Sequence, residues 1–435
     1  MAGVSHPGVS VYDRLRCDDA SLSARLAAGQ HRRELEALLG HAEYQTLAAA
    51  ARGAQRTPAR HGAPVYLLPG VLGTQLGWPR AAPLPADLLW IDPQDILAGR
   101  LSELRLPDGA GMHTLGALQY TYLLLRLRLQ AAGFEVRVYD YDWRLDLAQL
   151  AAQFAARLRT DGAAPKLVVA HSMGGLIARA ALALPGTAHV TRLVALGVPH
   201  GGAYGAVQAL RGTYPVVRRL AAIDPHHDAE TLSAEVFNTF PSLYALLPAR
   251  RAAQGLDLHD GAHWPQSGPR PQLPLLHAAR GFLASLPPPD VRQCAIAGTG
   301  QRTVVDVRLA NDEFQYAVSS AGDGTVAVAA ACLTGGRNYR VRCEHSALPR
   351  SAGVARALID LLHTGRTKRL PLVAEASTRA ACEPVWVGDN ELRTSWTSKV
   401  DWAHLAPDAR RDYLNRLNQP PALYGGRRPR RRTNQ

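Results

Sequence analysis

The middle of the chain alternates between continuous apolar runs and stretches with apolar residues at helical spacing. Residues 167–170 are all apolar, which is typical of a strand buried on both faces, and residues 176–182 have the spacing of a helix that ends before Pro185. Further strands are predicted at 64–68, 134–139 and 192–196, and further helices at 115–132 and 145–158. This order predicts the α/β fold class, with a mostly parallel, doubly covered sheet whose active site lies at the carboxyl ends of its strands.

The segments outside this alternation follow other patterns. Residues 22–39 and 42–51 are rich in alanine and leucine and predict helices. The proline-rich stretch 73–108 favours loops and short helices over sheet, and residues 203–290 interrupt the alternation with many proline, arginine and histidine residues. An insertion of that size over strand ends is a candidate lid.

The pattern of the core resumes after this insertion. Strands are predicted at 293–297 and 339–343, a hairpin at 303–309 and 314–318 joined through Asn311–Asp312, and helices at 353–362 and 407–417. We therefore expect a helical N-terminal extension (1–63), an α/β core (64–202 and 291–363), a lid or cap (203–290), and a polar C-terminal extension (364–435) with a basic tail.

Charge and composition narrow the possible partners. The 435 residues are 47% hydrophobic, which indicates a substantial core, and carry a net charge of +13. Five arginines lie in the tail at 427–432, which could meet nucleic acid, an anionic membrane or an acidic partner, or remain a solvated end. Outside the tail, the excess of positive charge is spread along the chain, so we expect no specific nucleic-acid binding.

The cysteines and the start of the chain bear on cofactors and location. No Cys-x-x-Cys pair occurs among the five cysteines, so neither a disulfide framework nor a zinc site is predicted, and no metal or organic cofactor is implied. No basic-then-apolar signal sequence opens the chain, and no apolar run reaches the length of a membrane span. A cytoplasmic location is the default expectation, with signal-independent export left open.

The strand at 167–170 leads into the most specific chemical feature of the sequence. Ser172 lies between this strand and the following helix, with the small residues Ala170 and Gly174 two positions away on either side. This is the pattern of a nucleophile elbow, in which a strained turn presents the serine at a helix N-terminus. An ordinary strand-to-helix turn that contains a serine is the alternative.

A serine nucleophile needs a base and an acid, which follow it in the order acid, then histidine, in a fold of this kind. Asp323, flanked by Gly322 and Gly324, follows the predicted hairpin, and His345 directly follows the strand at 339–343. Each could instead be an ordinary turn or loop residue. Because all three occur in the required order at strand ends, we expect folding to bring them together.

Other residues compete for these roles. His171 and His200 are rival bases, although the side chain before an elbow serine should point away from the site and His200 is expected to line the pocket. Asp142 and Asp312 are rival acids, but Asp142 precedes the serine, against the required order.

Two backbone amides should form an oxyanion hole. One is expected from Met173, directly after the nucleophile, and the other from Val71 or Leu72 in the turn after the first core strand.

Seven separate stretches carry a resemblance to a known family. They are VYLLPGVLGTQL (65–76), LLWIDPQDILAG (88–99), VYDYDWRL (138–145), AHSMGG (170–175), FPSLYALLP (240–248), GDGTV (322–326) and the histidine of EHSALP (344–349). Together, over about residues 64 to 362, the chain resembles the lecithin–cholesterol acyltransferase-like branch of the α/β-hydrolases.

The resemblance implies an α/β-hydrolase fold and serine acyl chemistry on lipid or other esters. It assigns Ser172 as nucleophile, Asp323 as acid and His345 as base. Asp142, Trp143 and Arg144 would be structural supports near the pocket. The chain lacks a cysteine between 73 and 108, where animal members close a lipid-contacting loop with a disulfide, so lipoprotein binding and a sterol acceptor are not expected.

These observations predict a serine esterase of lipase or phospholipase A type, or an acyltransferase, that acts through an acyl-enzyme. Its expected partners are a lipid or ester substrate and, transiently, a membrane surface. A non-catalytic binding protein on a hydrolase scaffold is one alternative, and an esterase for a polyester, thioester or peptide substrate is another.

Overall fold

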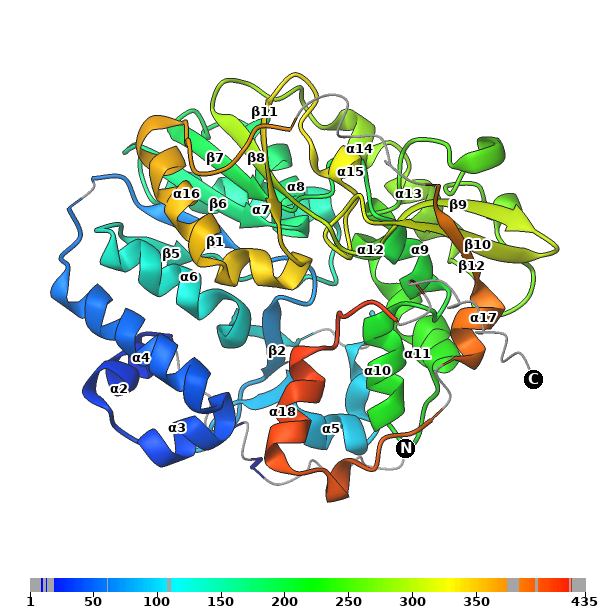
Figure 1. Ribbon diagram of the computed structural model, residues 1–435, viewed down its shortest axis with the longest axis horizontal. Coiled ribbons are helices and arrows are strands. Elements are labelled where there is room, and N and C mark those ends of the chain that lie inside the picture. Colours follow the sequence, from blue (N-terminus) through cyan, green and yellow to red (C-terminus); the bar gives the residue numbers. More distant parts are fainter. Residues whose placement is uncertain are drawn as a thin grey trace, which may run out of the picture.

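A six-stranded parallel sheet runs through the centre of the computed structural model, which describes residues 9–10, 13, 19–60, 62–107, 111–373, 383–395, 398–421 and 424 (Figure 1). In spatial order the strands are β11 (Arg337–Arg342), β8 (Gln293–Thr299), β7 (Val190–Leu196), β6 (Lys166–His171), β1 (Val65–Leu68) and β5 (Val136–Val138). Every strand predicted for the core is present, and all neighbours pair in parallel. The predicted α/β class and the mostly parallel sheet are confirmed.

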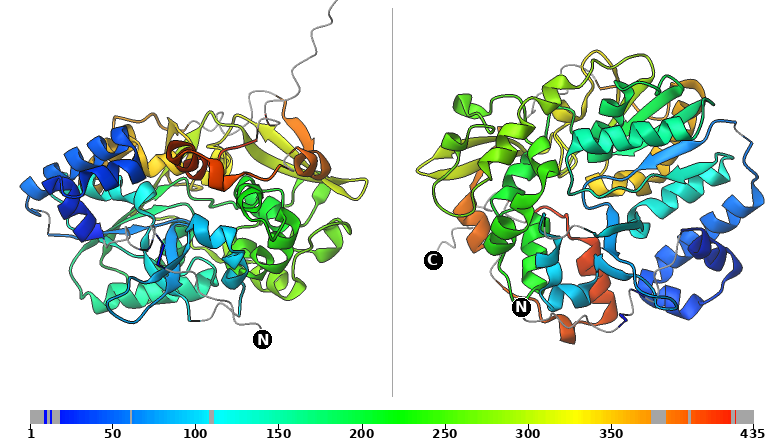
Figure 2. Two further views of the ribbon diagram at one scale, coloured as in Figure 1. Left: turned by 90° about the horizontal axis from the view of Figure 1, so that it is seen from below. Right: turned by 180° about the vertical axis from the view of Figure 1, so that it is seen from behind.

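Helices cover both faces of this sheet (Figures 1 and 2). The helices α7 (Leu147–Thr160) and α8 (Met173–Leu182) pack on one face, and α6 (Gln119–Ala131) and α16 (Ala352–Thr364) pack on the other. Successive residues of a strand point to opposite faces, so β1 contributes Tyr66 and Leu68 to the first core cluster and Val65 and Leu67 to the second. Burial on both faces explains why the central strands are continuously apolar.

The N-terminal helices that the apolar spacing predicted lie at one end of the molecule (Figure 1). They are α2 (Asp19–Ala28), α3 (Arg32–Leu39) and α4 (His41–Arg56). The predicted stretch 22–39 forms two helices, because the chain turns between them at Gly29 and His31, which both have positive φ. The buried leucines of the three helices pack against Leu123, Leu124 and Leu127, on the side of α6 that faces away from the sheet. The helix α6 is therefore apolar around most of its circumference.

The prediction of loops and short helices without sheet at 73–108 was wrong. A three-stranded antiparallel sheet forms there from β3 (Asp87–Trp90), β2 (Thr74–Trp78) and β4 (His113–Ala117), next to the short helices α5 (Pro93–Leu97) and η1 (Arg100–Leu104). The helix predicted to start at residue 115 starts only at Gln119, because β4 uses the preceding residues. Short strands with irregular register carry no clear alternation of polar and apolar residues, so the pattern did not reveal them.

The region between β7 and β8, for which the sequence predicts a lid or cap, forms helices and short 3₁₀ turns. Its elements are α9 (Tyr204–Leu210), α10 (Pro215–Ile223), α11 (Ala229–Glu235), η2 (Phe237–Thr239), α12 (Pro241–Ala245), η3 (Ala253–Gly255), η4 (Gly261–His263), α13 (Leu273–Ala279) and α14 (Phe282–Ser285).

Part of the C-terminal region belongs to a second small sheet, which the sequence did not predict. The strand β12 (Val385–Gly388) pairs with β10 (Glu313–Ser319) of the predicted hairpin, whose other strand is β9 (Thr303–Ala310). It is followed by α17 (Asp389–Thr394), η7 (Trp402–His404) and the predicted helix α18 (Pro407–Asn415). Residues after 364 are therefore more than a polar extension. The arginine-rich tail at 427–432 lies outside the described residues, as do Cys17 and Cys382.

None of the helices in the described part of the chain is long and apolar enough to cross a bilayer.

Candidate active site

Ser172 lies in the strained turn that the elbow pattern predicted. It follows β6 directly, precedes the first residue of α8, and has φ 53° and ψ −131°, which side-chain-bearing residues rarely adopt. A Cβ atom on Gly174 would lie 2.2 Å from the Pro69 carbonyl oxygen, and one on Gly175 would lie 2.1 Å from a methyl group of Val198. The glycines after the serine are thus required by the close approach of neighbouring strand ends.

The structure brings Ser172, Asp323 and His345 into one hydrogen-bonded row. The Nε2 atom of His345 is 2.9 Å from Ser172 Oγ, and its Nδ1 atom is 2.8 Å from Asp323 Oδ2. Asp323 lies in the loop after β10, and His345 opens η5 (His345–Arg350) after β11. Because a carboxylate can only accept, Nδ1 carries the proton, and Nε2 accepts from the serine hydroxyl.

The carboxylate of Asp323 is held from several sides. Its Oδ1 atom accepts hydrogen bonds from the backbone N–H groups of Thr325 and Val326, and its own carbonyl accepts from the His345 N–H group at 2.8 Å. Gly197, at the end of β7, leaves room for this pair, because a Cβ atom there would lie 3.1 Å from both Asp323 Oδ2 and His345 Nδ1. All three residues of the row are at most 6% exposed.

The turn after β1 lies directly against the serine. A Cβ atom on Gly70 would lie 2.8 Å from the Cβ atom of Ser172, and a hydrogen bond from Gly73 N to Gly70 O closes the turn that contains Val71 and Leu72. On the opposite side, Met173 is the first residue of α8, where helix geometry leaves the N–H group without an intrahelical acceptor.

The Tyr-Asp-Trp-Arg segment (141–144) donates hydrogen bonds to the backbone on both sides of the turn after β1. The Tyr141 hydroxyl donates to the Pro69 carbonyl at 2.6 Å, and Trp143 Nε1 donates to the Thr74 carbonyl at 3.0 Å. Asp142 forms an ion pair of 2.7 Å with Arg144 and makes no contact with His345. It therefore serves local structure and does not act as the acid of the row.

The other rival residues are engaged elsewhere. Asp312, at the tip of the hairpin between β9 and β10, accepts from the backbone N–H groups of Gln266 and Ser267. His200 lies 3.1 Å from a guanidinium nitrogen of Arg179, and burial together with that cation lowers the pKa of His200 to about 3. Neither residue bonds to the row.

The ring of His171 has Tyr122 and the backbone of His345 as its hydrogen-bond partners. Its Nε2 atom is 3.1 Å from the His345 carbonyl oxygen, and the two rings are 4.7 Å apart between centroids. Its Nδ1 atom is 2.9 Å from the hydroxyl of Tyr122, a residue of α6 that the sequence did not single out. Tyr122 occupies one more apolar position of a leucine-rich helix, so only its three-dimensional neighbours reveal it.

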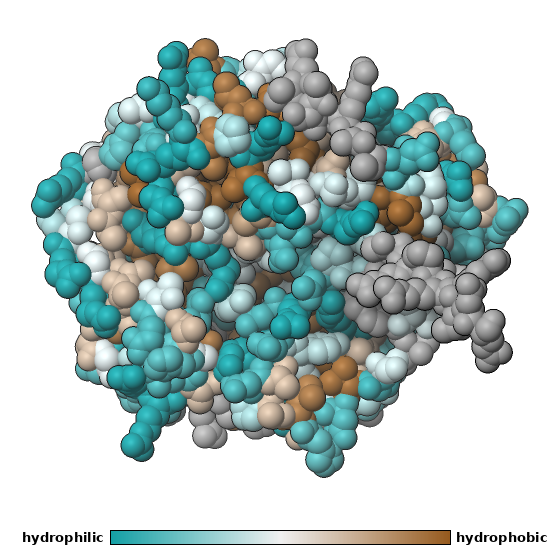
Figure 3. Space-filling view, viewed as in Figure 1, coloured by the Kyte–Doolittle hydropathy of each residue, from teal (hydrophilic) through white to brown (hydrophobic). Residues whose placement is uncertain are grey.

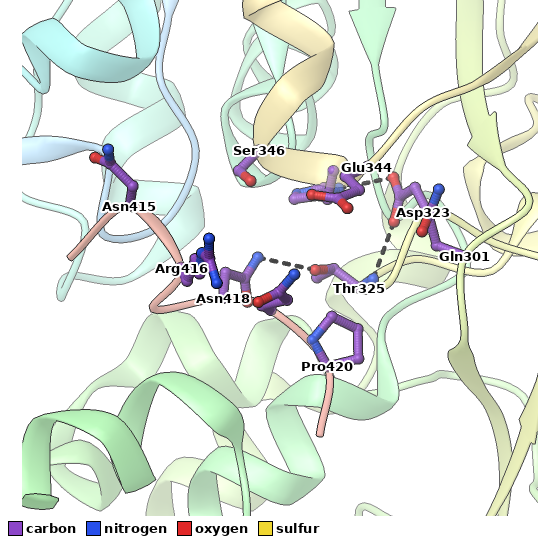
Figure 4. A pocket seen from close by; sticks show the side chains of 11 residues that line it. Gln301, Asp323, Thr325, Glu344, Ser346, Asn415, Arg416, Asn418 and Pro420 are labelled. Carbon is purple, nitrogen blue, oxygen red and sulfur yellow. Dashed lines mark hydrogen bonds and ion pairs between the residues drawn. The ribbon is translucent and has the colours of Figure 1, made fainter. Parts of the chain in front are cut away.

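A C-terminal strap, defined as residues 415–420, lies near Asp323 and Thr325 (Figure 4). A cavity of about 50 Å³ is lined by this strap and by residues of the two loops that hold Asp323 and His345. Asn418 fastens the strap because its amide donates to Thr325 Oγ1 at 3.1 Å and its oxygen accepts from the Tyr214 hydroxyl at 2.5 Å. No local pattern at 415–420 indicated this role.

Apolar side chains are scattered over the outer surface of the protein. Figure 3 shows a mostly polar face with smaller groups of apolar side chains between the polar ones. Within the described part of the chain, the exposed large apolar residues are Leu84, Tyr120, Leu273, Val291 and Leu372. Among the described residues, no group of three or more histidine, cysteine, aspartate or glutamate side chains is arranged to hold a metal ion.

Comparison with known proteins confirms the resemblance over part of the chain. Residues 115–258 match the model of the lecithin:cholesterol acyltransferase family. This range contains the Tyr-Asp-Trp-Arg segment, the elbow and residues 240–248, whereas Asp323 and His345 lie outside it. The match supports a hydrolase or acyltransferase of lipid esters in general. No curated protein sequence matches the chain.

Among the solved structures that are similar to this chain are a lipase and a chain of a two-protein complex. Bacillus licheniformis lipase BlEst2 in its mature form is 16% identical, with a TM-score of 0.37 over 70% of this chain and 94% of that chain. A chain of the Tle4–Tli4 complex is 14% identical, with a TM-score of 0.41 over 70% of this chain and 99% of that chain.

Proposed function

We propose that this protein is a serine esterase of lipase or phospholipase A type, or an O-acyltransferase, acting on lipid or other carboxylic esters. The observation that carries this proposal is the hydrogen bond of 2.9 Å between Ser172 Oγ and His345 Nε2, with Asp323 on the other ring nitrogen. A serine hydroxyl becomes a useful nucleophile when a neighbouring base can remove its proton.

In the proposed reaction, Ser172 Oγ attacks the ester carbonyl while its proton passes to Nε2 of His345. Asp323 stabilises the imidazolium that forms and keeps the ring in the required tautomer. The N–H groups of Met173 and Val71 would stabilise the negative charge on the former carbonyl oxygen. His345 then returns the proton to the departing alcohol, which leaves an acyl group on Ser172.

Hydrolysis and acyl transfer share all of these groups. The acyl-enzyme reacts with water in a hydrolase and with an acceptor alcohol in an acyltransferase, and His345 removes the proton of either nucleophile. Each step uses groups of the chain itself, and the substrate supplies the ester. We propose transient contact with a membrane surface as the way a lipid ester reaches the site.

The test combines covalent labelling with kinetics. A fluorophosphonate should label the wild-type protein at Ser172, and the Ser172→Ala variant should lose about 10⁴-fold or more of the hydrolysis rate on p-nitrophenyl esters, because the three residues act as a unit. Residual activity within tenfold of wild type would defeat the assignment. Product analysis with phospholipid vesicles, with and without an added alcohol, then separates hydrolysis from transfer.

A further inference from the structure

A second row of hydrogen bonds, separate from that of Ser172, His345 and Asp323, links the turn after β1 to the backbone of His345. In this subsection, the row means this second one. The N–H group of Gly70 donates to the Tyr122 hydroxyl oxygen at 2.8 Å, which lies 2.9 Å from His171 Nδ1. The Nε2 atom of His171 lies 3.1 Å from the His345 carbonyl oxygen. The four residues come from β1's turn, α6, β6 and η5, so the row crosses the site behind the serine.

The chemistry of the end groups fixes the direction of every bond in the row. The His345 carbonyl can only accept, so the proton of the neutral His171 ring is on Nε2, which donates to that carbonyl. Nδ1 is then unprotonated and accepts from the Tyr122 O–H group. The Tyr122 oxygen in turn accepts from the Gly70 N–H group, which can only donate.

The surroundings favour the neutral forms that this row requires. His171 and Tyr122 are 4% and 3% exposed. Burial, with a further contribution from His345, holds the pKa of His171 well below its usual range, and burial raises the pKa of Tyr122. The ring of His171 contacts the ring of His345 on one side and that of Tyr122 on the other, with centroids 4.7 Å and 5.8 Å apart.

The two ends of the row belong to the proposed oxyanion turn and to the proposed base, whose relative position must be correct for the reaction. Gly70 precedes Val71, the proposed second oxyanion donor, and its backbone lies against the Cβ atom of Ser172. His345 is the proposed base. An error of about 1 Å in the relative position of such groups can reduce catalysis by about 100-fold.

We propose that Tyr122 and His171 are positioning residues that couple the oxyanion turn to the catalytic base. This inference rests on the proposed function. It predicts that either residue affects the reaction through the geometry of Gly70 and His345 and that the two act as one unit. If they only filled space in the core, their loss would lower stability and leave the chemical step unchanged.

The kinetic test compares Tyr122→Phe and His171→Phe, which keep an aromatic ring and break the row at one point each. With a soluble p-nitrophenyl ester, each variant should lower kcat by about 10- to 100-fold and leave KM within about threefold. The kcat of the double variant should be no lower than that of the worse single variant, because one broken hydrogen bond already uncouples Gly70 from His345. Multiplying losses, or an unchanged kcat, would overturn the proposal.

Two further variants control for packing. His171→Gln restores a side-chain N–H group near the position of Nε2 and should recover kcat about tenfold relative to His171→Phe. Tyr120→Phe, two residues from Tyr122 on α6 and partly exposed, should leave kcat unchanged. Thermal unfolding of all variants identifies any loss of kcat that comes from a smaller folded fraction.

A spectroscopic measurement is independent of catalysis. The ¹⁵N chemical shifts of the His171 ring should show a neutral ring with its proton on Nε2, and a proton on Nδ1 would refute the row. Ser172→Ala separates the two proposals. If this variant stays active, the proposed function fails, whereas an inactive Ser172→Ala together with independent effects of Tyr122 and His171 defeats the positioning role alone.

Discussion

His345 and Asp323 contact each other twice, once through side chains and once through the backbone. The ring nitrogen Nδ1 lies 2.8 Å from the carboxylate oxygen Oδ2, and the His345 N–H group donates to the Asp323 carbonyl at 2.8 Å. The loops that follow β10 and β11 are thus joined by a backbone bond that does not depend on the carboxylate. The chemical role of the carboxylate can therefore be tested without separating the two loops.

We predict that Asp323→Asn lowers kcat by about 10⁴-fold and leaves the fold intact. The amide can donate toward the ring, which favours the tautomer that cannot accept the serine proton, and it cannot stabilise the imidazolium. The measurement is kcat on a p-nitrophenyl ester together with the thermal unfolding midpoint. If a well-folded variant loses less than tenfold in kcat, Asp323 is not the acid that acts with His345 and Ser172.

We predict that Gly70→Ala impairs catalysis through contact with the nucleophile. The added methyl group would lie 2.8 Å from Ser172 Cβ and 3.4 Å from its Oγ, so the turn or the serine must shift, and kcat should fall by about 100-fold. The matched control is Gly353→Ala, where the new methyl group meets only Ser351 Oγ at 3.7 Å and activity should be unchanged. Equal activity of the two variants contradicts the close approach.

We predict that Asp389→Asn destabilises the protein by about 3–5 kcal/mol, because it leaves the buried Arg211 without its charge partner. Both side chains are 1% exposed, and their bond of 2.9 Å joins α17 to the end of α9. The control is Asp412→Asn, which breaks an ion pair with Arg416 that is more than 60% exposed on both sides and should change stability by less than about 1 kcal/mol. Urea denaturation measures both, and similar losses would refute the prediction.

We predict that Asp95 makes stability depend on pH in the acidic range. Burial raises the pKa of Asp95 from 3.8 to about 7, although its ion pair with Arg100 opposes the rise. Between these two values the folded state holds a proton that the unfolded state has lost, so the free energy of unfolding falls as pH rises from about 4 to 7. Asp95→Asn should flatten this slope in denaturation curves measured across that range. A slope that the substitution leaves unchanged counts against the shift.

Much of the core could be predicted because its patterns are local. Strands buried on both faces are continuously apolar, and the small residues two positions before and after Ser172 predict the strained turn that the structure shows. The sheet of β3, β2 and β4 escaped prediction because its strands are short and irregular in register, and β12 escaped it because its partner lies far away in the chain. Pairing of β12 with β10 joins residues 385–388 to 315–318, and nothing in either stretch specifies the other.

The sequence by itself determined the alternation of strands and helices, the strain at Ser172 and the set of residues able to perform acyl chemistry, since each follows from side chains that are neighbours along the chain. Only the tertiary structure decided which histidine meets the serine, because His171 ends β6 while His200 and His345 follow β7 and β11, so all three lie near the carboxyl ends of strands of the sheet. It also decided that Tyr122 and Asn418 belong to the surroundings of the site. Their contacts join positions from 49 to 204 residues apart, and such contacts depend on how the strand ends and the C-terminal strap are placed in space.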